Sequence, residues 1–559
     1  MDRGLCVSVY LNKNRGPGSA AAPHVLRLSV MLLLLLLALL SPRAAGDPGP
    51  RPGSWTWTRT RPRPSPRDSD VYLDLDLSSV RHRVDTRFLS FTIDASLAEK
   101  ERFMALLSSV KLQTLTKALR PAFLRFGGSR QDFMEFQRSP WSCGLTLLPW
   151  WLEEQLKEEW AQFQEILIKE DLEADYGDLK FTATTVDQLY SFSSCCGLDL
   201  VFGLNALLRT KENSWDGANA ALLLEYCQAR GYRMSWELGN EPNSFRKKAG
   251  VVVDGQQLGR DFAQLRELMS RFELYRQAGL YGPDVSQPRH RRADILDGFL
   301  ETGAQSIDAV TWHHYYVCGR DTSLNDFLNP DILDTLNDNI TKILEHGAPG
   351  KPVWLGETSS AYGGGAPGLS NAFVAGFMWL DKLGLAASRG LQVVMRQALI
   401  GPGKYQLVDP NLDPFPDYWL SILHKRLVGR RVLRVEMLSQ LGQGERVRVY
   451  LHCASKRSSS SGAVVLLSMN LSDEPAVLFL PPSVSSSSVE AFVLQADQPG
   501  EQGVLSRNVM LNGVVLKMVD DRTFPDLRGT RLPPADRLQL PPFSMAFFLF
   551  HEAGAPACS

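Results

Sequence analysis

The sequence has almost no net charge and lacks the short motifs that usually bind metal ions. Sixty Lys and Arg oppose 61 Asp and Glu, a formal net charge of −1 over 559 residues, so no global field draws the chain to nucleic acid or to a membrane. Neither C-x-x-C nor H-E-x-x-H occurs. Beyond the first 46 residues, no apolar run approaches the roughly 20 residues that a membrane-spanning helix needs. We therefore expect no cofactor, no metal, no nucleic-acid partner and no transmembrane segment.

The N-terminus has the layout of a secretory signal. Arg27 precedes the run LSVMLLLLLLALL, and Pro42, Arg43 and three small residues follow it. A membrane anchor is the alternative, but the run is shorter than a spanning helix requires. We predict a signal peptide at 1–46, a disordered Pro/Arg-rich leader at 47–70, and a secreted mature chain.

Secretion changes the interpretation of the cysteines, because thiols outside the cytosol usually pair. Eight cysteines are present, and Cys6 falls in the predicted signal, which leaves an odd number, so at least one should stay free. The sequons at Asn339 and Asn470 predict glycosylation on exposed loops.

Alternating patterns predict an α/β fold with two domains. Eight apolar strand candidates, from FLSFTID to LQVVMRQALIG, alternate with amphipathic helix candidates over 83–430, which favours parallel strands closed into a (β/α)8 TIM barrel. From residue 431 to 559 short alternating strands and serine-rich turns predict a C-terminal β-sandwich. The early strand VYLDLDL, within 71–82, is expected to join that sandwich.

One barrel unit carries a long insert, from about Phe136 to Leu179. It contains the amphipathic, acidic and aromatic stretch LLPWWLEEQLKEEWAQFQEILIKEDLEADYG. Three interpretations stay open: a plain insertion, a lid over the barrel mouth, or a removable propeptide at 137–175.

Two glutamates end predicted barrel strands. Glu241 follows the fourth strand in SWELGNEPNSF, and Glu357 lies at the end of the seventh in VWLGETSS. Chemistry in a parallel barrel sits at the carboxyl ends of its strands, and glycoside cleavage needs one carboxylic acid of raised pKa and one ionised carboxylate. We therefore predict a catalytic pair, with surface or salt-bridge roles as the alternative. Asn240, beside Glu241, strengthens the hypothesis.

Basic residues near the same strand ends are candidates for binding an anionic substrate, since guanidinium groups bind sulfate and carboxylate well. The first cluster, after the fifth strand, contains Arg289, Arg291 and Arg292, and the second is Arg246 to Lys248. A solvated helix start is the alternative for the first. The adjacent His313 and His314 face opposite sides of a strand and cannot easily share a metal ion.

The motifs WELGNEPNSF, AVTWHHYY, VWLGETSSAYGGGAP and PDYWLSIL resemble the heparanase family, endo-β-glucuronidases that cut heparan sulfate, from about Val71 to Cys558. The resemblance implies a retaining mechanism, with Glu241 as acid/base, Glu357 as nucleophile and Asn240 bonding the sugar 2-hydroxyl. It implies substrate contacts at Asp94, Ala95, Ser96, Ser129, His313, Tyr315, Arg320, Tyr362, Gly363, Gly364, Gly403 and Tyr405. Glycines 363 to 365 would let backbone N–H groups approach an anion closely.

The resemblance further implies disulfides Cys143–Cys195 and Cys453–Cys558, with Cys196 unpaired. It implies that an activating protease removes the insert, with cleavage near Arg138 and near 173–177, to leave a heterodimer of small and large subunits. Heparan sulfate proteoglycans would be the partners, in the lysosome and the extracellular matrix.

The sequence departs from the family in two ways: the insert is short, and the stretch after it, EDLEADYGDLKF, is acidic where the family has a basic run. Tight binding of highly sulfated chains is thereby in doubt. Alternatives are a non-catalytic heparan-sulfate-binding relative, which departs from the GETSSAYGGG motif that this chain keeps, and an exo-acting β-glucuronidase.

Overall fold

The computed structural model describes residues 70–139, 148–288, 294–346, 350–438 and 446–559. The predicted signal peptide, nearly all of the leader, Cys143 and the cluster of Arg289, Arg291 and Arg292 lie outside this part of the chain.

Eight parallel strands close into a barrel in sequential order, which confirms the predicted TIM-barrel fold. The strands are β3 (Leu89–Asp94), β4 (Phe123–Gly127), β7 (Asp199–Leu204), β8 (Ser235–Leu238), β9 (Leu280–Val285), β10 (Ala309–Cys318), β11 (Val353–Tyr362) and β12 (Val393–Ile400). The main helices of the barrel are α2 (Val110–Ala118), α4 (Ala183–Cys196), α5 (Ala218–Ala229), α7 (Gly255–Ser270), α8 (Asp294–Gly303), α10 (Pro330–His346), α11 (Ala375–Ser388) and α12 (Pro416–Leu427).

Aromatic side chains fill the part of the barrel interior near the amino ends of the strands. Phe123, Tyr281 and Trp354 come from three different strands, and the Trp354 ring centroid lies 4.9 Å from that of Phe123 and 4.2 Å from that of Tyr281. The interior is therefore a packed core and not a pore. Polar groups are confined to the upper part, toward the carboxyl ends of the strands.

The insert in the second unit is held by its own small sheet. Strands β5 (Met134–Gln137) and β6 (Leu179–Thr182) pair in parallel, and helix α3 (Trp150–Glu173) lies between them in the chain. One face of α3 is buried, including Trp160 and Leu167, whereas Trp150 and Trp151 are exposed.

The C-terminal part is all β, as predicted, and its strands form one continuous hydrogen-bonded path. Strand β1 (Asp70–Asp76) pairs antiparallel with β13 (Val428–Met437) and parallel with β16 (Ala476–Phe479), so it joins what would otherwise be two sheets. The remaining strands are β2 (His82–Arg83), β14 (Val447–Ala454), β15 (Val464–Asn470), β17 (Val489–Ala496), β18 (Val509–Leu511), β19 (Val514–Val515), β20 (Thr530–Leu532), β21 (Arg537–Leu540) and β22 (Ser544–Phe550).

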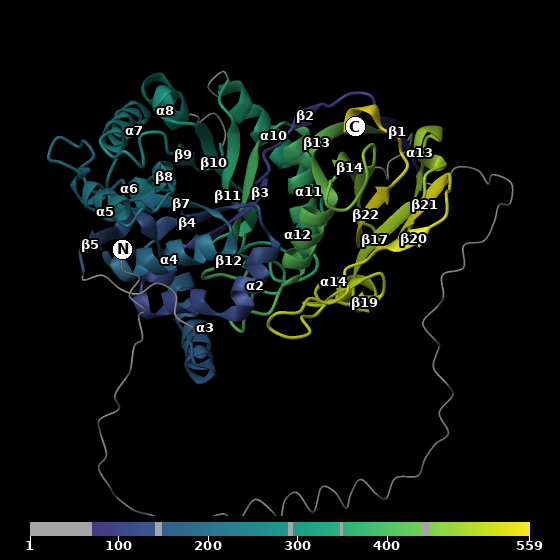
Figure 1. Cartoon of the computed structure of the whole chain (residues 1–559), viewed down its shortest axis with the longest axis horizontal. Coiled ribbons are helices and arrows are strands. Elements are labelled where there is room, and N and C mark those ends of the chain that lie inside the picture. The colour runs from purple at the N-terminus through teal and green to yellow at the C-terminus, as the bar shows by residue number, and fades with distance from the viewer. Residues whose placement is uncertain (1–69, 140–147, 289–293, 347–349, 439–445) are drawn as a thin grey trace, which may run out of the picture. The chain divides into compact units, whose positions relative to one another are not determined.

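The β sheet packs against barrel helices on one face and encloses its own core on the other (Figure 1). In β15, Val465 and Leu467 belong to the core shared with the barrel, and Val464 and Leu466 belong to the sheet's own core. Strand residues alternate between faces, so one strand serves both cores. At α11 the fit is close: a Cβ on Gly384 would lie 2.1 Å from the Tyr450 ring.

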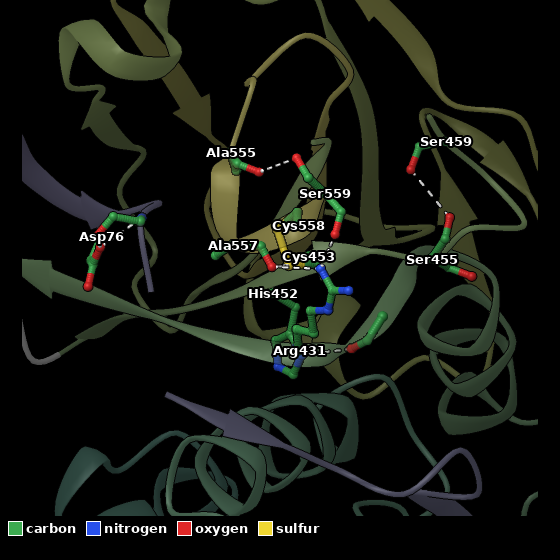
Figure 2. The surroundings of a disulfide bond; sticks show 12 residues. Asp76, Arg431, His452, Cys453, Ser455, Ser459, Ala555, Ala557, Cys558 and Ser559 are labelled. Carbon is green, nitrogen blue, oxygen red and sulfur yellow. Dashed lines mark hydrogen bonds between the residues drawn. A yellow bond between two sulfur atoms is a disulfide. The ribbon is translucent and has the colours of Figure 1, made fainter. Parts of the chain in front are cut away.

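A disulfide fixes the C-terminal end of the chain to the sheet (Figure 2). Cys453, in β14, is bonded to Cys558, which confirms the second predicted pair. Arg431 Nη1 also donates to the backbone oxygens of Ala557 and Ser559, at 2.8 and 2.7 Å. Cys195 is exposed and bonded to no other cysteine of the described ranges. Its predicted partner Cys143 lies outside them, and that pairing stays a prediction.

The expectation that both sequons lie on exposed loops is wrong. Asn339 lies within α10 and is 8% exposed, and Asn470 ends β15 with no exposed surface. The Asn470 Nδ2 donates to the backbone oxygens of Glu474, Leu540 and Pro541. A glycan requires that nitrogen in solvent, so the Asn470 amide is a structural group in this fold.

Within the described ranges, the helices are too short or too polar to cross a membrane.

Candidate active site

The two predicted catalytic glutamates come from the fourth and seventh barrel strands, as the sequence indicated. Glu241 follows β8, and Glu357 lies within β11. Glu241 has a φ of 52° and a ψ of 63°, and its N–H donates to the Asp284 carbonyl at 3.0 Å. A left-handed conformation is costly for a residue with a side chain and tends to mark functional positions. Here it turns the chain sharply, directly after the strand.

A β-bulge decides where Glu357 points. In the pairing of β10 with β11, Trp312 is opposite Leu355 but His313 is opposite Glu357, so Gly356 is an extra residue. Trp354 faces the barrel interior, and regular alternation would turn Glu357 away from it. The bulge restores the inward direction. Only glycine fits at 356, because a Cβ there would lie 2.6 Å from Asp284 Oδ1.

Both glutamates line one cavity of about 220 Å³ at the carboxyl ends of the strands. Most of the predicted substrate contacts line it too: Asp94, Ser129, Tyr315, Arg320, Tyr362, Gly363, Gly364 and Tyr405. Of the second basic cluster, Lys247 and Lys248 line the cavity. Ala95, Ser96, Asn240, His313, Gly403 and Arg246 are described residues outside its lining. Asn240 and His313 instead contact groups just beneath it.

Arg125, a residue that the sequence analysis missed, organises the site. It lies on β4 with no exposed surface, and its Nε and Nη1 contact Glu237 Oε2 at 2.6 Å and Glu357 Oε2 at 2.8 Å. Its Nη2 lies 3.6 Å from Asp284 Oδ2. Burying one guanidinium among three carboxylates is tolerable only because the charges offset one another. Burial and the neighbouring Asp284 together raise the pKa of Glu237 to about 8, against the opposing effect of Arg125.

Glu357 is held by two donors. Arg125 binds Oε2, and the Tyr315 hydroxyl donates to Oε1 at 2.7 Å. Both donors stabilise the ionised carboxylate and fix its orientation. Such a group is suited to act as a nucleophile, with one face toward the cavity.

Glu241 lies beside a histidine, and its pKa is shifted in the direction opposite to expectation. His313 Nδ1 lies 3.4 Å from Glu241 Oε1, and Lys248 Nζ lies 3.8 Å from Oε2. Burial favours the neutral acid, but the nearby His313 ring and the charge of Lys248 outweigh it and lower the pKa of Glu241 to about 2. The pKa of Glu241 is thus shifted down in this form, whereas a general acid needs a raised pKa.

His313 can hold that proton because acidic groups surround it. Its Nε2 lies 3.2 Å from Asp284 Oδ1. Burial opposes protonation, but the charge of Glu357 and the bonds to Asp284 and Glu241 raise the pKa of His313 to about 9. The sequence analysis assigned no role to Asp284. The two shifts favour an ionised Glu241 beside a protonated His313.

Asn240 is fixed from two sides. Its N–H donates to Asp132 Oδ2 at 2.8 Å, and its Oδ1 accepts from Arg125 Nη2 at 3.0 Å. These two bonds fix the position of the Asn240 side chain beside Arg125. The His314 ring packs against Trp312 and Tyr316, away from the carboxylates that His313 contacts, so the two adjacent histidines do face opposite sides.

Helix α3 and the turn after it occupy one side of the cavity. Asp171, Leu172, Ala174 and Tyr176 line it beside the two glutamates. Arg130, 3% exposed and directly after β4, donates to Asp171 Oδ1 at 2.8 Å and to Glu170 Oε2 at 2.6 Å. Carboxylates of the insert therefore bind Arg130, a cation at the mouth of the barrel.

The same helix packs against the glycine turn. A Cβ on Gly364 would lie 3.2 Å from Ile168 Cγ2, and one on Gly363 would lie 3.3 Å from Leu172 Cδ2. Lys404 Nζ binds Glu165 Oε1 at 2.6 Å. With α3 in place, its side chains Ile168 and Leu172 lie against this turn and narrow the space beside the two glycines.

Sequence reasoning missed Arg125, Asp284 and Arg130 because each looks ordinary in the chain. Arg125 sits in an apolar strand, AFLRFGG, and Asp284 in GLYGPDV. A charged residue inside a buried strand costs free energy unless it is paired. A charged residue in an apolar strand was therefore the signal that could have identified them. The same signal applies to Glu237 in SWELGNE.

An eight-stranded barrel with one carboxylate after its fourth strand and another on its seventh has the arrangement of a glycosidase site. The family model described as "Glycosyl hydrolase family 79, N-terminal domain" matches residues 153–384. Heparanase of Bos taurus is 47% identical over 499 residues, which cover 85% of this chain and 90% of that protein. Inactive heparanase-2 of Homo sapiens is 37% identical over 530 residues, covering 87% and 89%.

Among solved structures, a 4-O-α-L-rhamnosyl-β-D-glucuronidase from Fusarium oxysporum superposes with a TM-score of 0.58 at 15% identity, covering 86% of this chain and 99% of that one. At that identity the likeness shows the fold alone. Fold, site and relatives together define a glycoside hydrolase. The chain belongs to the heparanase family.

Proposed function

We propose that this protein is a retaining endo-β-glucuronidase that cleaves internal glucuronidic bonds of heparan sulfate. The observation that carries the proposal is the placement of Glu241 and Glu357 around one cavity, each with partners suited to its role. The relatives named heparanase support the substrate. Lys247, Lys248 and Arg320 at the same cavity supply cations for an anionic sugar.

In the proposed mechanism Glu357 attacks the anomeric carbon and forms a glycosyl ester, while Glu241 protonates the departing oxygen. The proton comes from the Glu241–His313 pair. As Glu357 loses its charge in forming the ester, His313 loses the main electrostatic support for its proton. The proton then moves to Glu241 and on to the leaving group. Water attacks the ester in the second step and returns a proton to the pair.

We further propose that a protease activates the secreted protein by removing the insert, within 137–175, to leave a heterodimer that acts in lysosomes and the extracellular matrix. Support comes from α3, whose Asp171 and Leu172 line the catalytic cavity. A polymer could not pass through the cleft while those side chains remain. The paired strands β5 and β6 lie at the two ends of the insert and would keep the two subunits joined.

The decisive experiment uses protein from which the insert has been removed, together with Glu241→Gln and Glu357→Gln variants and a Glu345→Gln control on the exposed face of α10. Each is incubated with heparan sulfate, and the products are sized. We expect large fragments from the parent and the control, and intact polymer from either cleft variant. Free monosaccharide would instead indicate exo action. Intact polymer from the parent would indicate a non-catalytic relative. One of the relatives, inactive heparanase-2, is named as such.

A further inference from the structure

A second polar cavity, of about 210 Å³, lies where the barrel meets the C-terminal sheet. Lys425 and Arg426, in the last turn of α12, form one side of it, and Arg457, in the loop after β14, forms another. Phe492 and Leu549, from β17 and β22, supply an apolar wall. Each water fills about 30 Å³ of liquid, so the cavity has room for a small ion and several waters.

This cavity is far from the catalytic one. Lys425 Nζ donates to the carbonyl of Pro121, and Arg457 Nη1 donates to that of Arg120 at 3.3 Å. Those two residues lie directly before β4, which starts at Phe123. They therefore mark the amino-terminal end of the barrel, opposite the end at which Glu241 and Glu357 lie.

The three cations at the cavity are not neutralised locally. Among the described residues, Lys425, Arg426 and Arg457 have no carboxylate oxygen within 4.0 Å, although Asp85 exerts a longer-range attraction on Lys425. Burial and the nearby Arg457 lower the pKa of Lys425 to about 7. The positive charges thus repel one another across a shared space.

The acidic groups at the same cavity are already used. Glu490 accepts from the Gly529 N–H at 3.0 Å and lies 3.2 Å from His551 Nε2. Asp526 binds Arg528, the fourth cation of the lining, through Nη2 at 2.6 Å. Neither carboxylate forms an ion pair with the three cations, although Asp526, which lies outside the lining, attracts Arg426 at longer range. The three cations therefore remain available to an anion from outside.

We propose that this cavity binds a tetrahedral oxyanion, sulfate or phosphate in type, between Lys425, Arg426 and Arg457. The anion is either free in solution or a sulfate group carried by a glycan chain. Only the second source rests on the proposed function. Two arginines offer forked donors and the lysine a third point of contact, which suits an anion with several acceptor oxygens.

The test uses the full chain and the double variant Arg426→Gln/Arg457→Gln. Both side chains are exposed, so the variant should fold. The matched control is Arg233→Gln/Arg276→Gln, two exposed arginines in loops before β8 and β9, at the same end of the barrel. Sulfate stabilises proteins generally by exclusion from their surface, so the control also corrects for that effect.

In the first arm, melting temperature is followed against sodium sulfate and sodium phosphate, with sodium chloride at equal ionic strength. A saturable rise is expected in the parent and the control but not in the double variant. In the second arm, binding to immobilised heparan sulfate is measured at several salt concentrations. If the glycan is the source, the double variant binds on the order of tenfold more weakly, and the slope of log affinity against log salt falls by about 2.

A loss in the first arm alone supports a site for a free anion, and a loss in both supports a glycan sulfate. Equal behaviour of the double variant and the control in both arms would overturn the proposal. Neither arm measures cleavage, so a protein that binds the anion but cuts no glycan would refute the proposed function and leave this site standing.

Discussion

Arg125 Nη1 donates to Glu357 Oε2 over 2.8 Å, and the Nε of the same guanidinium lies 2.6 Å from Glu237 Oε2. One buried cation thus positions the proposed nucleophile and neutralises the acidic interior of the barrel. The arrangement makes catalysis and stability depend on the same residue.

Replacing Arg125 with glutamine should lower both the catalytic activity and the stability of the protein. Loss of one partner leaves buried carboxylates unpaired, which typically costs about 3–5 kcal/mol, and Glu357 loses one of its two donors. Urea unfolding and kcat/KM on a short glycoside measure the two effects. Arg125→Lys keeps the charge without the fork and should recover part of the stability. Unfolding of Arg125→Gln within 1 kcal/mol of the parent would show that the carboxylates do not need this cation.

The raised pKa of His313 predicts a pH-dependent contribution to stability. Its pKa is about 9 in the folded protein against 6.5 ordinarily, so the contribution is fully present below about pH 6.5 and is lost as the pH rises through 9. At ~1.4 kcal/mol per pKa unit, this amounts to about 3 kcal/mol. Urea unfolding of the parent and of His313→Gln should show a gap at pH 6 that closes by pH 9.5. A difference in unfolding free energy that does not change with pH would show that protonation of His313 does not contribute to stability.

Protonation of Asp171 at low pH should not release helix α3 from the catalytic cavity. Burial raises the pKa of Asp171 to about 6, against the effect of Arg130. The docked form therefore takes up a proton that the undocked form does not, and docking becomes more favourable as the pH falls from about 6 toward 4.

Hydrogen-exchange protection factors for α3, which correct for intrinsic pH effects, measure this. We expect protection at pH 5 to equal or exceed that at pH 7, and Asp171→Asn to be protected at pH 7 at least as well as the parent. Weaker protection at pH 5 would mean that Glu170 or another group controls docking.

The buried Asn470 amide should act as a structural group. Asn470→Ala removes the donor for three backbone oxygens, and unsatisfied buried polar groups cost about 1–3 kcal/mol. We expect the free energy of unfolding to fall by about 2–3 kcal/mol, whereas Asn337→Ala, on the partly exposed side of α10, should change it by about 0.5 kcal/mol or less. Peptide mass analysis should find Asn470 unmodified in the folded protein, and a glycan there would contradict the burial.

Much of the fold could be predicted from residue patterns, because strand and helix periods are local. Eight apolar runs alternating with amphipathic helices defined the barrel, and the count of strands placed Glu241 and Glu357 on the fourth and seventh. Their chemistry followed from position, since the carboxyl ends of parallel strands meet at one face. The sequons misled because the triplet carries no information about burial.

Sequence by itself determined the class of fold, the strands that deliver the two glutamates and the family to which the chain belongs, because those depend on period, order and long motifs. Tertiary structure alone decided that Gly356 bulges to turn Glu357 inward, and that Arg125 lies between Glu237 and Glu357. It also brought His313 Nδ1 to within 3.4 Å of Glu241 Oε1, and this neighbour lowers the pKa of Glu241. Charges and bulges act through space, between residues that are far apart in the chain, and no local pattern records those distances.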